Sequence, residues 1–437
     1  MRRGGWDHAF RTNGHALRRP QPEFEKGVAP GHTMLSSLPG LGAVFLAAWL
    51  CSSSRSSIRL RVVLSALAVQ IGIAIIVLKL PAGRTALQSM AAGVEALLSY
   101  SRVGVTLLFG DLISPSVHNS IFLFVLPAII FFSALVSVLY HLGWMQFLIG
   151  ILGGGIGRVI GVDRIEGLFA AANIFLGQTE SPLVIRPYLR DLGLAQTFAV
   201  MTSGMAGVAG TVLAAYAQIG IRLDYLLAAS FMSAPAGLLM AKIVMPDTEA
   251  DRQYAGRVTP TEASGDVARE RGNIILAASE GTQTGIRIAA GVGGMLLAFS
   301  ALIALVNGLL GFGGQTIGID GLTVQGVLGH VLAPVMYLFG LTWPEAVATG
   351  SLFGEKLILN EFVAYVDYVG VQHTLSPHAQ AVAIFALCGF ANLGSIAIQV
   401  AVLGSISKEN RALVSKLGLR RFSPRRWPIF LMRQSQV

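Results

Sequence analysis

Long apolar stretches with few charged side chains run through this chain and limit what it can fold into. Several are close to the ~20 residues that a helix needs to cross a bilayer; they cover 34–51, 62–81, 119–142, 196–218, 224–243, 287–311 and 381–405. Only 13% of the 437 residues are charged, against about 25% in a typical soluble domain. The sequence therefore predicts an all-α membrane protein with several spans, located in the plasma membrane.

The net charge of +9 does not indicate a nucleic-acid partner. Arginine and lysine gather at the ends of the apolar stretches and in the two tails, as expected from the positive-inside rule. The two cysteines, Cys51 and Cys388, both lie in apolar segments. They predict neither a disulfide framework nor a metal cluster.

Two apolar segments are broken by Gly, Pro and polar residues. One contains "GQTESPLVIRPYL" at 177–189, and the other contains "LNEF" at 359–362. Each is followed by a Gly/Ala/Ser-rich span, at 203–217 and 388–402, and a weak internal repeat results from aligning Gly204 with Gly389 and Ala206 with Ala391. Broken segments at matching places in two halves are typical of a transporter's midplane binding site. We therefore expect an inverted repeat with two re-entrant helical hairpins, whose polar residues face a cavity.

Glu180 and Glu361 are the first candidates for function, because a carboxylate at membrane depth is costly to bury. The alternative is a structural ion pair with Arg186 or Lys356. Hydrogen-bonding or aromatic side chains accompany both carboxylates: Gln178, Thr179, Phe390, Asn392 and Ser395. Asn392 and Ser395 are placed on one helix face by their spacing, although an asparagine there also commonly links helices, and a phenylalanine commonly just packs. The set suits a sugar-plus-base solute, and an amino acid could use much of it.

With these motifs the chain resembles the concentrative nucleoside transporter family. The matching stretches are "NIFLGQTESPLVIRPYL", "SGMAGVAGTVLAAY", "AASFMSAPAGLLMAKIVMPDTE", "KLILNEFVAY" and "ALCGFANLGSIAIQ". The resemblance implies a homotrimer in the lipid bilayer with eight spans per protomer, interfacial helices and two re-entrant hairpins. It also implies an elevator-like transport domain that imports nucleosides together with H⁺ or Na⁺, without any other cofactor.

The resemblance also assigns roles by position. Gln178, Thr179 and Glu180 would contact the nucleobase, which Val212 would flank. Glu361, Asn392 and Ser395 would hold the ribose hydroxyls, in a cavity that Phe390 lines.

The cation ligands implied by the family lie near Asn173 and Leu176, and include a Ser or Thr hydroxyl where this chain has Gly207. Glycine offers no ligand, although Thr211 is one turn away. Sodium and proton coupling therefore both stay open, with Glu361 or Glu180 as the titrating group of a proton-coupled protein. Gly177 together with Thr211 is similar to purine-accepting members, so we expect purine as well as pyrimidine nucleosides to be transported.

The sequence divides into regions with different expected roles. They are a polar leader at 1–33, N-terminal spans at 34–143, a first repeat at 144–245, a hydrophilic loop ending in an amphipathic helix at 246–285, a second repeat at 286–405 and a basic tail at 406–437. The leader suggests either a true start at Met34 or a disordered tail. The family continues into a last span where this chain has only the short apolar run "WPIFLM", so we expect that span to be missing.

An intramembrane enzyme with Glu180 and Glu361 as an acid/base pair is the main competing hypothesis. The chain has no H-E-x-x-H motif and no nucleophile elbow, which are the usual marks of such enzymes. A transporter of another small polar solute is the second alternative. We therefore expect a secondary transporter and no catalytic activity.

Overall fold

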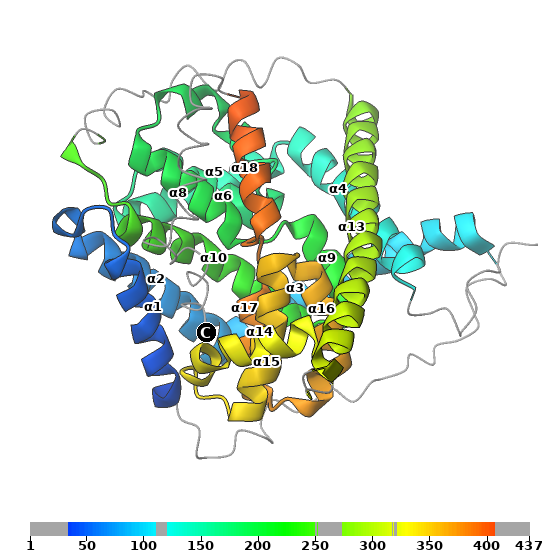
Figure 1. The fold of residues 1–437 in the computed structure, drawn as a ribbon. Coiled ribbons are helices and arrows are strands. Elements are labelled where there is room, and N and C mark those ends of the chain that lie inside the picture. Colours follow the sequence, from blue (N-terminus) through cyan, green and yellow to red (C-terminus); the bar gives the residue numbers. More distant parts are fainter. Residues whose placement is uncertain are drawn as a thin grey trace, which may run out of the picture.

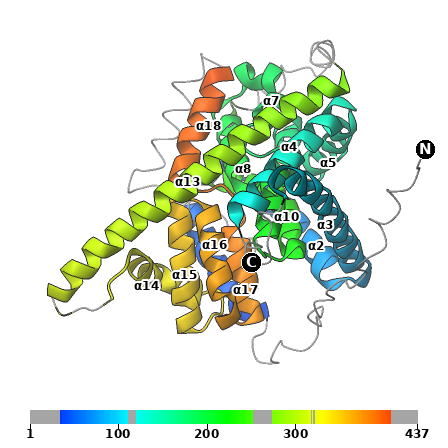
Figure 2. The same ribbon diagram turned by 90° about the vertical axis from the view of Figure 1, so that its right-hand side faces the viewer.

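The computed structural model describes residues 34–110, 120–249, 251, 273–316, 318 and 321–406. These residues form helices (Figures 1 and 2) and, within the described ranges, no β-strand. The predictions for the leader at 1–33, and for the missing span after residue 406, concern residues outside the described part. The main helices are α1 (Leu38–Leu50), α2 (Leu60–Ala74), α3 (Pro81–Phe109), α4 (Leu126–His141), α5 (Trp144–Ile160), α6 (Arg164–Leu176), α7 (Ser181–Val184), α8 (Leu194–Ala206), α9 (Gly210–Gln218), α10 (Leu223–Val244), α13 (Ile274–Thr316), α14 (Val324–Tyr337), α15 (Trp343–Ile358), α16 (Glu361–Val371), α17 (Pro377–Leu387) and α18 (Leu393–Ile406).

The predicted all-α membrane fold is confirmed. Continuous helical segments at or near the predicted spans are long and apolar enough to cross a bilayer, including Leu60–Val77 with α2, Ile121–His141 with α4, and the helices α10 and α13. The sequence prediction missed α3, a 29-residue helix. The most apolar 18-residue stretch of this helix has a mean hydropathy of only 1.2. Charged residues such as Arg84, Glu95 and Arg102 lower its hydropathy and hid it from a search for apolar runs.

Two predicted spans, 196–218 and 381–405, are not continuous helices. The first divides into α8 and α9 at Gly207, where the backbone is extended. The second divides into α17 and α18, and Gly389 in that break has a φ of 142°, a conformation that favours glycine. The two breaks touch, because the backbone N–H of Phe390 donates to the carbonyl of Gly207 at 3.3 Å. Gly204, which the sequence aligns with Gly389, lies inside α8, three residues before the first break.

Each of the two polar insertions lies between two helices. The first fills the interval between α6 and α7, where Gly177 has a φ of 78°. The second lies between α15 and α16, where the side chain of Asn360 accepts a hydrogen bond from the backbone N–H of Val363 and caps α16. We call residues 177–180 the first tip and residues 359–361 the second tip.

The far ends of these helix pairs are also fixed by side chains. α6 begins with a capping box between Asp163 and Glu166, and α15 begins with one between Thr342 and Glu345. Glu166 is buried, and its Oε1 accepts a hydrogen bond from Lys242 Nζ of α10 at 2.6 Å. This ion pair holds the start of α6 against the end of α10.

The longest helix, α13, has 43 residues and includes the predicted span 287–311. The predicted boundary at residue 285 therefore lies within one helix, and the division of the chain into regions stays a prediction. α13 lies along α4 (Figure 2), and a Cβ added at Gly281 or Gly285 would come within 2.5 Å or 2.7 Å of α4 atoms. Small residues here allow the close helix contact that is common in membranes. Ser137 of α4 also donates to the carbonyl of Ala277 at 2.7 Å.

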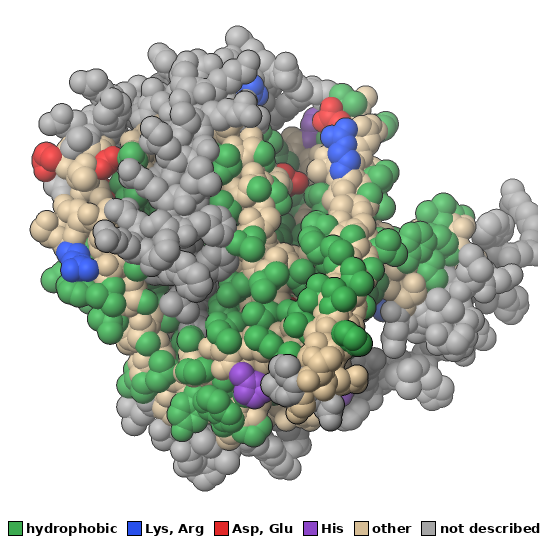
Figure 3. All heavy atoms as spheres, viewed as in Figure 1, with side chains coloured by type: hydrophobic (Ala, Val, Ile, Leu, Met, Phe, Trp, Pro, Cys, Tyr) green, Lys and Arg blue, Asp and Glu red, His purple; other side chains and the backbone are tan. Residues whose placement is uncertain are grey.

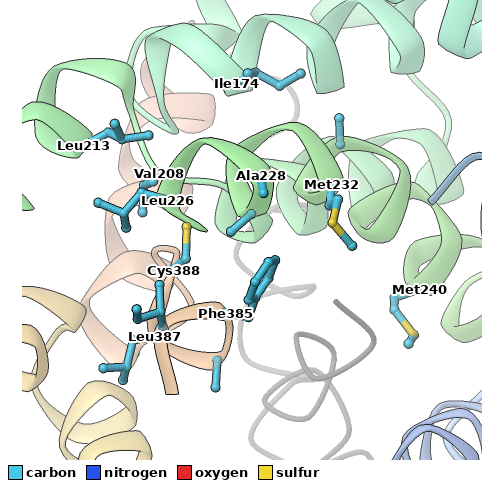
Figure 4. Packing of buried hydrophobic residues seen from close by; sticks show 14 of the residues in the cluster. Ile174, Val208, Leu213, Leu226, Ala228, Met232, Met240, Phe385, Leu387 and Cys388 are labelled. Carbon is cyan, nitrogen blue, oxygen red and sulfur yellow. The ribbon is translucent and has the colours of Figure 1, made fainter. Parts of the chain in front are cut away.

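The core is built around α10. In its most apolar 18-residue stretch, 94% of the residues are buried. Side chains of α6, α8, α9 and α17 pack against it in one apolar cluster. Figure 4 shows part of this cluster, with side chains from α10 and from the end of α17. In contrast, apolar side chains cover much of the outer face seen in Figure 3, as expected for a surface that faces lipid.

Candidate substrate site

Glu361, the first residue of α16, is the centre of a buried polar network at the second tip. Its side chain is buried, its Oε1 accepts a hydrogen bond from Tyr216 Oη at 2.9 Å, and its Oε2 accepts one from Asn392 Nδ2 at 3.2 Å. The donors come from α9 and from the break before α18. Since each carboxylate oxygen has two lone pairs, Glu361 can accept further hydrogen bonds from a bound hydroxyl.

Asn392 is placed differently from the prediction. It does not share a helical face with Ser395 but lies before α18, where its Oδ1 accepts a hydrogen bond from the Ser395 backbone N–H at 2.7 Å. Asparagine is favoured in this capping role because its side chain satisfies a free N–H of the first turn. The cap fixes the amide, so that its oxygen faces the helix and its nitrogen faces Glu361.

The network continues from α18 to the first tip. Gln178 Nε2 donates to Ser395 Oγ at 3.0 Å, and Gln399 Nε2 lies 3.5 Å from Gln178 Oε1. All three side chains are buried. Gln178, Ser395, Asn392 and Glu361, which the sequence indicated separately, are thus brought together in one connected set.

Among the described residues, the side chains of the remaining predicted contacts make no hydrogen bond to this network. Thr179 is exposed and Glu180 is half-buried, and within the described part of the chain the Glu180 carboxylate has no hydrogen bond or ion pair. The alternative of a structural pair between Glu180 and Arg186 is therefore not formed here. Val212 of α9 is buried, and Phe390 is half-buried in the break before α18.

Two residues of this network were missed by sequence reasoning. Tyr216 is fully buried, with its ring 4.6 Å from that of Tyr365 and 5.4 Å from that of Phe362, between centroids. Gln399 lies one turn beyond Ser395 and is also fully buried. A glutamine in an apolar span was a usable signal, because a buried amide needs partners. A tyrosine in such a span gives little signal, because most pack as apolar rings.

The predicted cation residues lie on either side of the Gly207 break. Asn173 and Leu176 belong to α6, and Thr211 is in the first turn of α9; all three are buried. Asn173 Nδ2 donates to the carbonyl of Ser203 at 2.8 Å. A Cβ at Gly207 would lie 2.8 Å from this same Nδ2, so the Asn173 amide occupies the space that a serine side chain would need.

Comparison with known proteins identifies the chain. Residues 39–112 and 225–423 match the models described as the N-terminus and the C-terminus of Na⁺-dependent nucleoside transporters, and residues 122–223 match a model described as nucleoside recognition. The nucleoside permease NupC of Helicobacter pylori is 42% identical over 88% of this chain and 93% of its own length. This chain belongs to the concentrative nucleoside transporter family.

Solved structures agree with this assignment. CNTnw in an inward-facing, substrate-bound state is 41% identical, with a TM-score of 0.83 over 92% of this chain and 95% of that one. A CNTnw variant in an outward-facing state has a TM-score of 0.85 at 40% identity, over 92% and 97% of the two chains. The chain is therefore similar throughout most of its length to transporters, and the hypothesis of an intramembrane enzyme is not supported.

Proposed function

We propose that this protein imports nucleosides across the plasma membrane, driven by an inward cation gradient, and that the Glu361 network binds the ribose. The observation that carries this proposal is the hydrogen-bonded connection from Gln178 at the first tip, through Ser395 and Asn392, to Glu361 at the second tip. A solute bound against this connection touches both helix pairs at once. Binding of the solute is thereby coupled to the position of the α6–α7 pair relative to the α15–α16 pair.

The two ends of a nucleoside need different partners. Ribose hydroxyls are donors, and the lone pairs of the Glu361 carboxylate can accept from them beside Asn392 and Ser395. The base presents donors and acceptors at its edge, which Gln178, Thr179 and Glu180 can meet, and a flat face, which Val212 and Phe390 can cover. The lack of a partner for Glu180 among the described residues supports its role as a substrate ligand.

Acceptance of purines as well as pyrimidines is a further part of the proposal. A Cβ added at Gly177 would lie 2.6 Å from the Cβ of Ala209, and the residue has a positive φ. Both features favour glycine at this position, where the first tip packs closely against Ala209. The expectation for purines itself comes from the similarity of Gly177 and Thr211 to purine-accepting members of the family. Excess adenosine or inosine is expected to inhibit labelled uridine uptake, and failure of both to compete would contradict this.

We propose H⁺ as the coupling ion. Gly207 lacks a hydroxyl, and the Asn173 amide fills the adjacent space, so one oxygen ligand for a hard cation is lost. The description of the family models favours sodium as the alternative. Uridine uptake into proteoliposomes with pH and sodium gradients imposed separately distinguishes the two. Sodium-driven uptake that ignores a pH gradient would refute the proposal.

We also propose assembly as a homotrimer, for which the outer face of α13 is available as a contact surface. In the most apolar 18-residue stretch of α13, only 6% of the residues are buried within one chain. Large side chains such as Leu297, Leu309 and Phe312 are exposed. Such a surface faces either lipid or another copy. Native mass spectrometry of protein extracted in mild detergent is expected to give three copies, and a monomer alone would contradict this assembly.

The transport activity itself is tested by counterflow. Proteoliposomes loaded with unlabelled uridine are expected to take up labelled uridine faster than empty ones, because a carrier returns faster when loaded. A channel would show no such acceleration, and an enzyme would convert the uridine chemically.

A further inference from the structure

A second carboxylate of the α15–α16 pair lies outside the nucleoside network. Glu355 of α15 is only 2% exposed, and both of its carboxylate oxygens are buried without a hydrogen-bond partner among the described residues. Asp367 of α16 and Gln325 of α14 lie beside it. A buried carboxylate with neither a donor nor a cation is costly in its ionised form.

The amide of Gln325 is held in place from α13. Asn307 Nδ2 donates to Gln325 Oε1 at 2.9 Å, and Asn307 Oδ1 accepts from the backbone N–H of Val324 at 2.8 Å. Because its oxygen is used by Asn307, Gln325 can turn its N–H₂ group to the carboxyl side. A polar chain thus runs from α13 through α14 to the α15–α16 pair.

The charges around Glu355 do not compensate it. From α16 it faces Asp367, a like charge, and from α14 it faces Gln325, which is neutral. The next residue along α15, Lys356, donates to the carbonyl of Ala386 on α17 at 2.6 Å. None of the ion pairs in the described part of the chain includes Glu355. Glu355 is buried and Asp367 beside it is half-buried, and ionising both of two adjacent carboxyl groups is costly, so that such a pair is suited to hold one proton.

The contrast with Glu361 shows which carboxylate is suited to carry a proton. Glu361 accepts hydrogen bonds from Tyr216 and Asn392, which stabilise its anionic form. Among the described residues neither oxygen of Glu355 accepts such a hydrogen bond, although the Gln325 amide lies beside it, and its neutral form can donate its O–H to Asp367. Of the two carboxylates, Glu355 is the one whose charge is compensated by fewer hydrogen bonds.

We propose that Glu355 and Asp367 form a proton-binding site, and that its single shared proton is the ion that drives nucleoside import. This inference rests on the proposed function and specifies its coupling site. On loading, one carboxylate takes up one proton and the pair changes from two negative charges to one; on release the proton returns to water. Because the polar chain reaches α13, movement of the α15–α16 pair relative to α13 would change the surroundings of this proton.

Infrared spectroscopy of the full chain in nanodiscs tests proton binding without transport. The wild-type protein is expected to show the C=O stretching band of a protonated carboxyl near neutral pH, and Glu355→Gln is expected to remove it. Asp367→Asn is expected to lower the pH at which the band disappears, because it removes a neighbouring negative charge. Glu280→Gln, which alters an exposed carboxylate on α13, serves as the control. A band that is absent from the wild type, or unchanged in Glu355→Gln, would overturn the proposal.

Uridine flux tests the coupling role. In Glu355→Gln, accumulation driven by an inward pH gradient is expected to fall to the level seen without a gradient, while uridine counterflow continues. If this variant does not fold, Asp367→Asn provides the same comparison with a shifted pH dependence. Wild-type accumulation that ignores the pH gradient, or a normal response in both variants, would overturn the coupling role. Absence of counterflow in the wild type would instead contradict the proposed transport function. In that case the infrared result alone would decide whether the proton site exists.

Discussion

The two tips present their carboxylates in opposite states. At the second tip, Glu361 is buried and both its oxygens accept hydrogen bonds from the protein. At the first tip, Glu180 is half-buried and, in the described part of the chain, has no partner. The difference indicates that Glu361 is positioned in advance, whereas Glu180 is available for a ligand or for water.

This difference has a physical consequence for substitutions. Burying an anion is tolerable at Glu361 because Tyr216 and Asn392 replace its hydration. At Glu180, partial exposure lets water do the same. Changes at Glu361 should therefore affect both binding and stability, and changes at Glu180 should affect binding alone.

Glu361→Gln is expected to have the largest effect and to abolish uridine uptake. The amide N–H₂ would face either the Tyr216 hydroxyl or the Asn392 amide, and a buried donor left unpaired costs about 1–3 kcal/mol. The loss of an acceptor for the ribose hydroxyls adds to this. Uptake in proteoliposomes and the thermal unfolding midpoint should both fall, with Glu280→Gln, at an exposed position of α13, as the control. Wild-type uptake by this variant would refute the assignment of Glu361.

Asn392→Ala is expected to act in the same direction but less strongly. It removes one donor to Glu361 and the cap of α18, and loss of an N-cap costs about 0.5–2 kcal/mol. Asn392→Ser keeps a capping oxygen and should recover part of the stability without restoring full uptake. Equal behaviour of the two variants in unfolding experiments would show that the cap is unimportant.

Glu180→Gln sharpens the comparison between the tips. Nucleoside binding should weaken, because a ligand for the base loses its charge, while the unfolding midpoint should stay within error of the wild type. Isothermal titration with uridine and thermal unfolding on the same preparation measure both effects. A clear drop in the midpoint would mean that Glu180 has a structural partner after all.

Tyr216→Phe is expected to have the smallest effect of the four. The ring contacts with Tyr365 and Phe362 are kept, and only one hydrogen bond to the Glu361 carboxylate is lost, worth about 1.5–3 kcal/mol for a charged acceptor. That corresponds to roughly a ten- to hundredfold weaker uridine affinity. Unchanged affinity would indicate that Asn392 alone positions the carboxylate.

Part of this site could be predicted from the sequence. Four polar residues of the site lie in otherwise apolar segments: Gln178, Glu361, Asn392 and Ser395. Polar residues at membrane depth need hydrogen-bond partners, so a contact among these four could be expected from the sequence. The breaks at Gly207 and Gly389 were not foreseen, because glycine in a membrane helix more often indicates close packing, as it does at Gly281.

Other features depend on tertiary contacts that the sequence does not display. Tyr216 donates to a residue 145 positions away, and nothing in its local sequence distinguishes it from a packed ring. The capping role of Asn392 became visible only once the helix start at Leu393 was known. Local pattern thus located the polar residues, and the three-dimensional fold determined their partners.

The most direct test of the central claim measures uridine and 2′,3′-dideoxyuridine binding to the wild type and to Glu361→Gln. Dideoxyuridine lacks the hydroxyls that Glu361 is proposed to hold. The wild type should bind uridine much more tightly than the dideoxy compound, and the variant should bind the two about equally weakly. Equal affinities in the wild type, or undiminished discrimination in the variant, would contradict the claim that Glu361 binds the ribose.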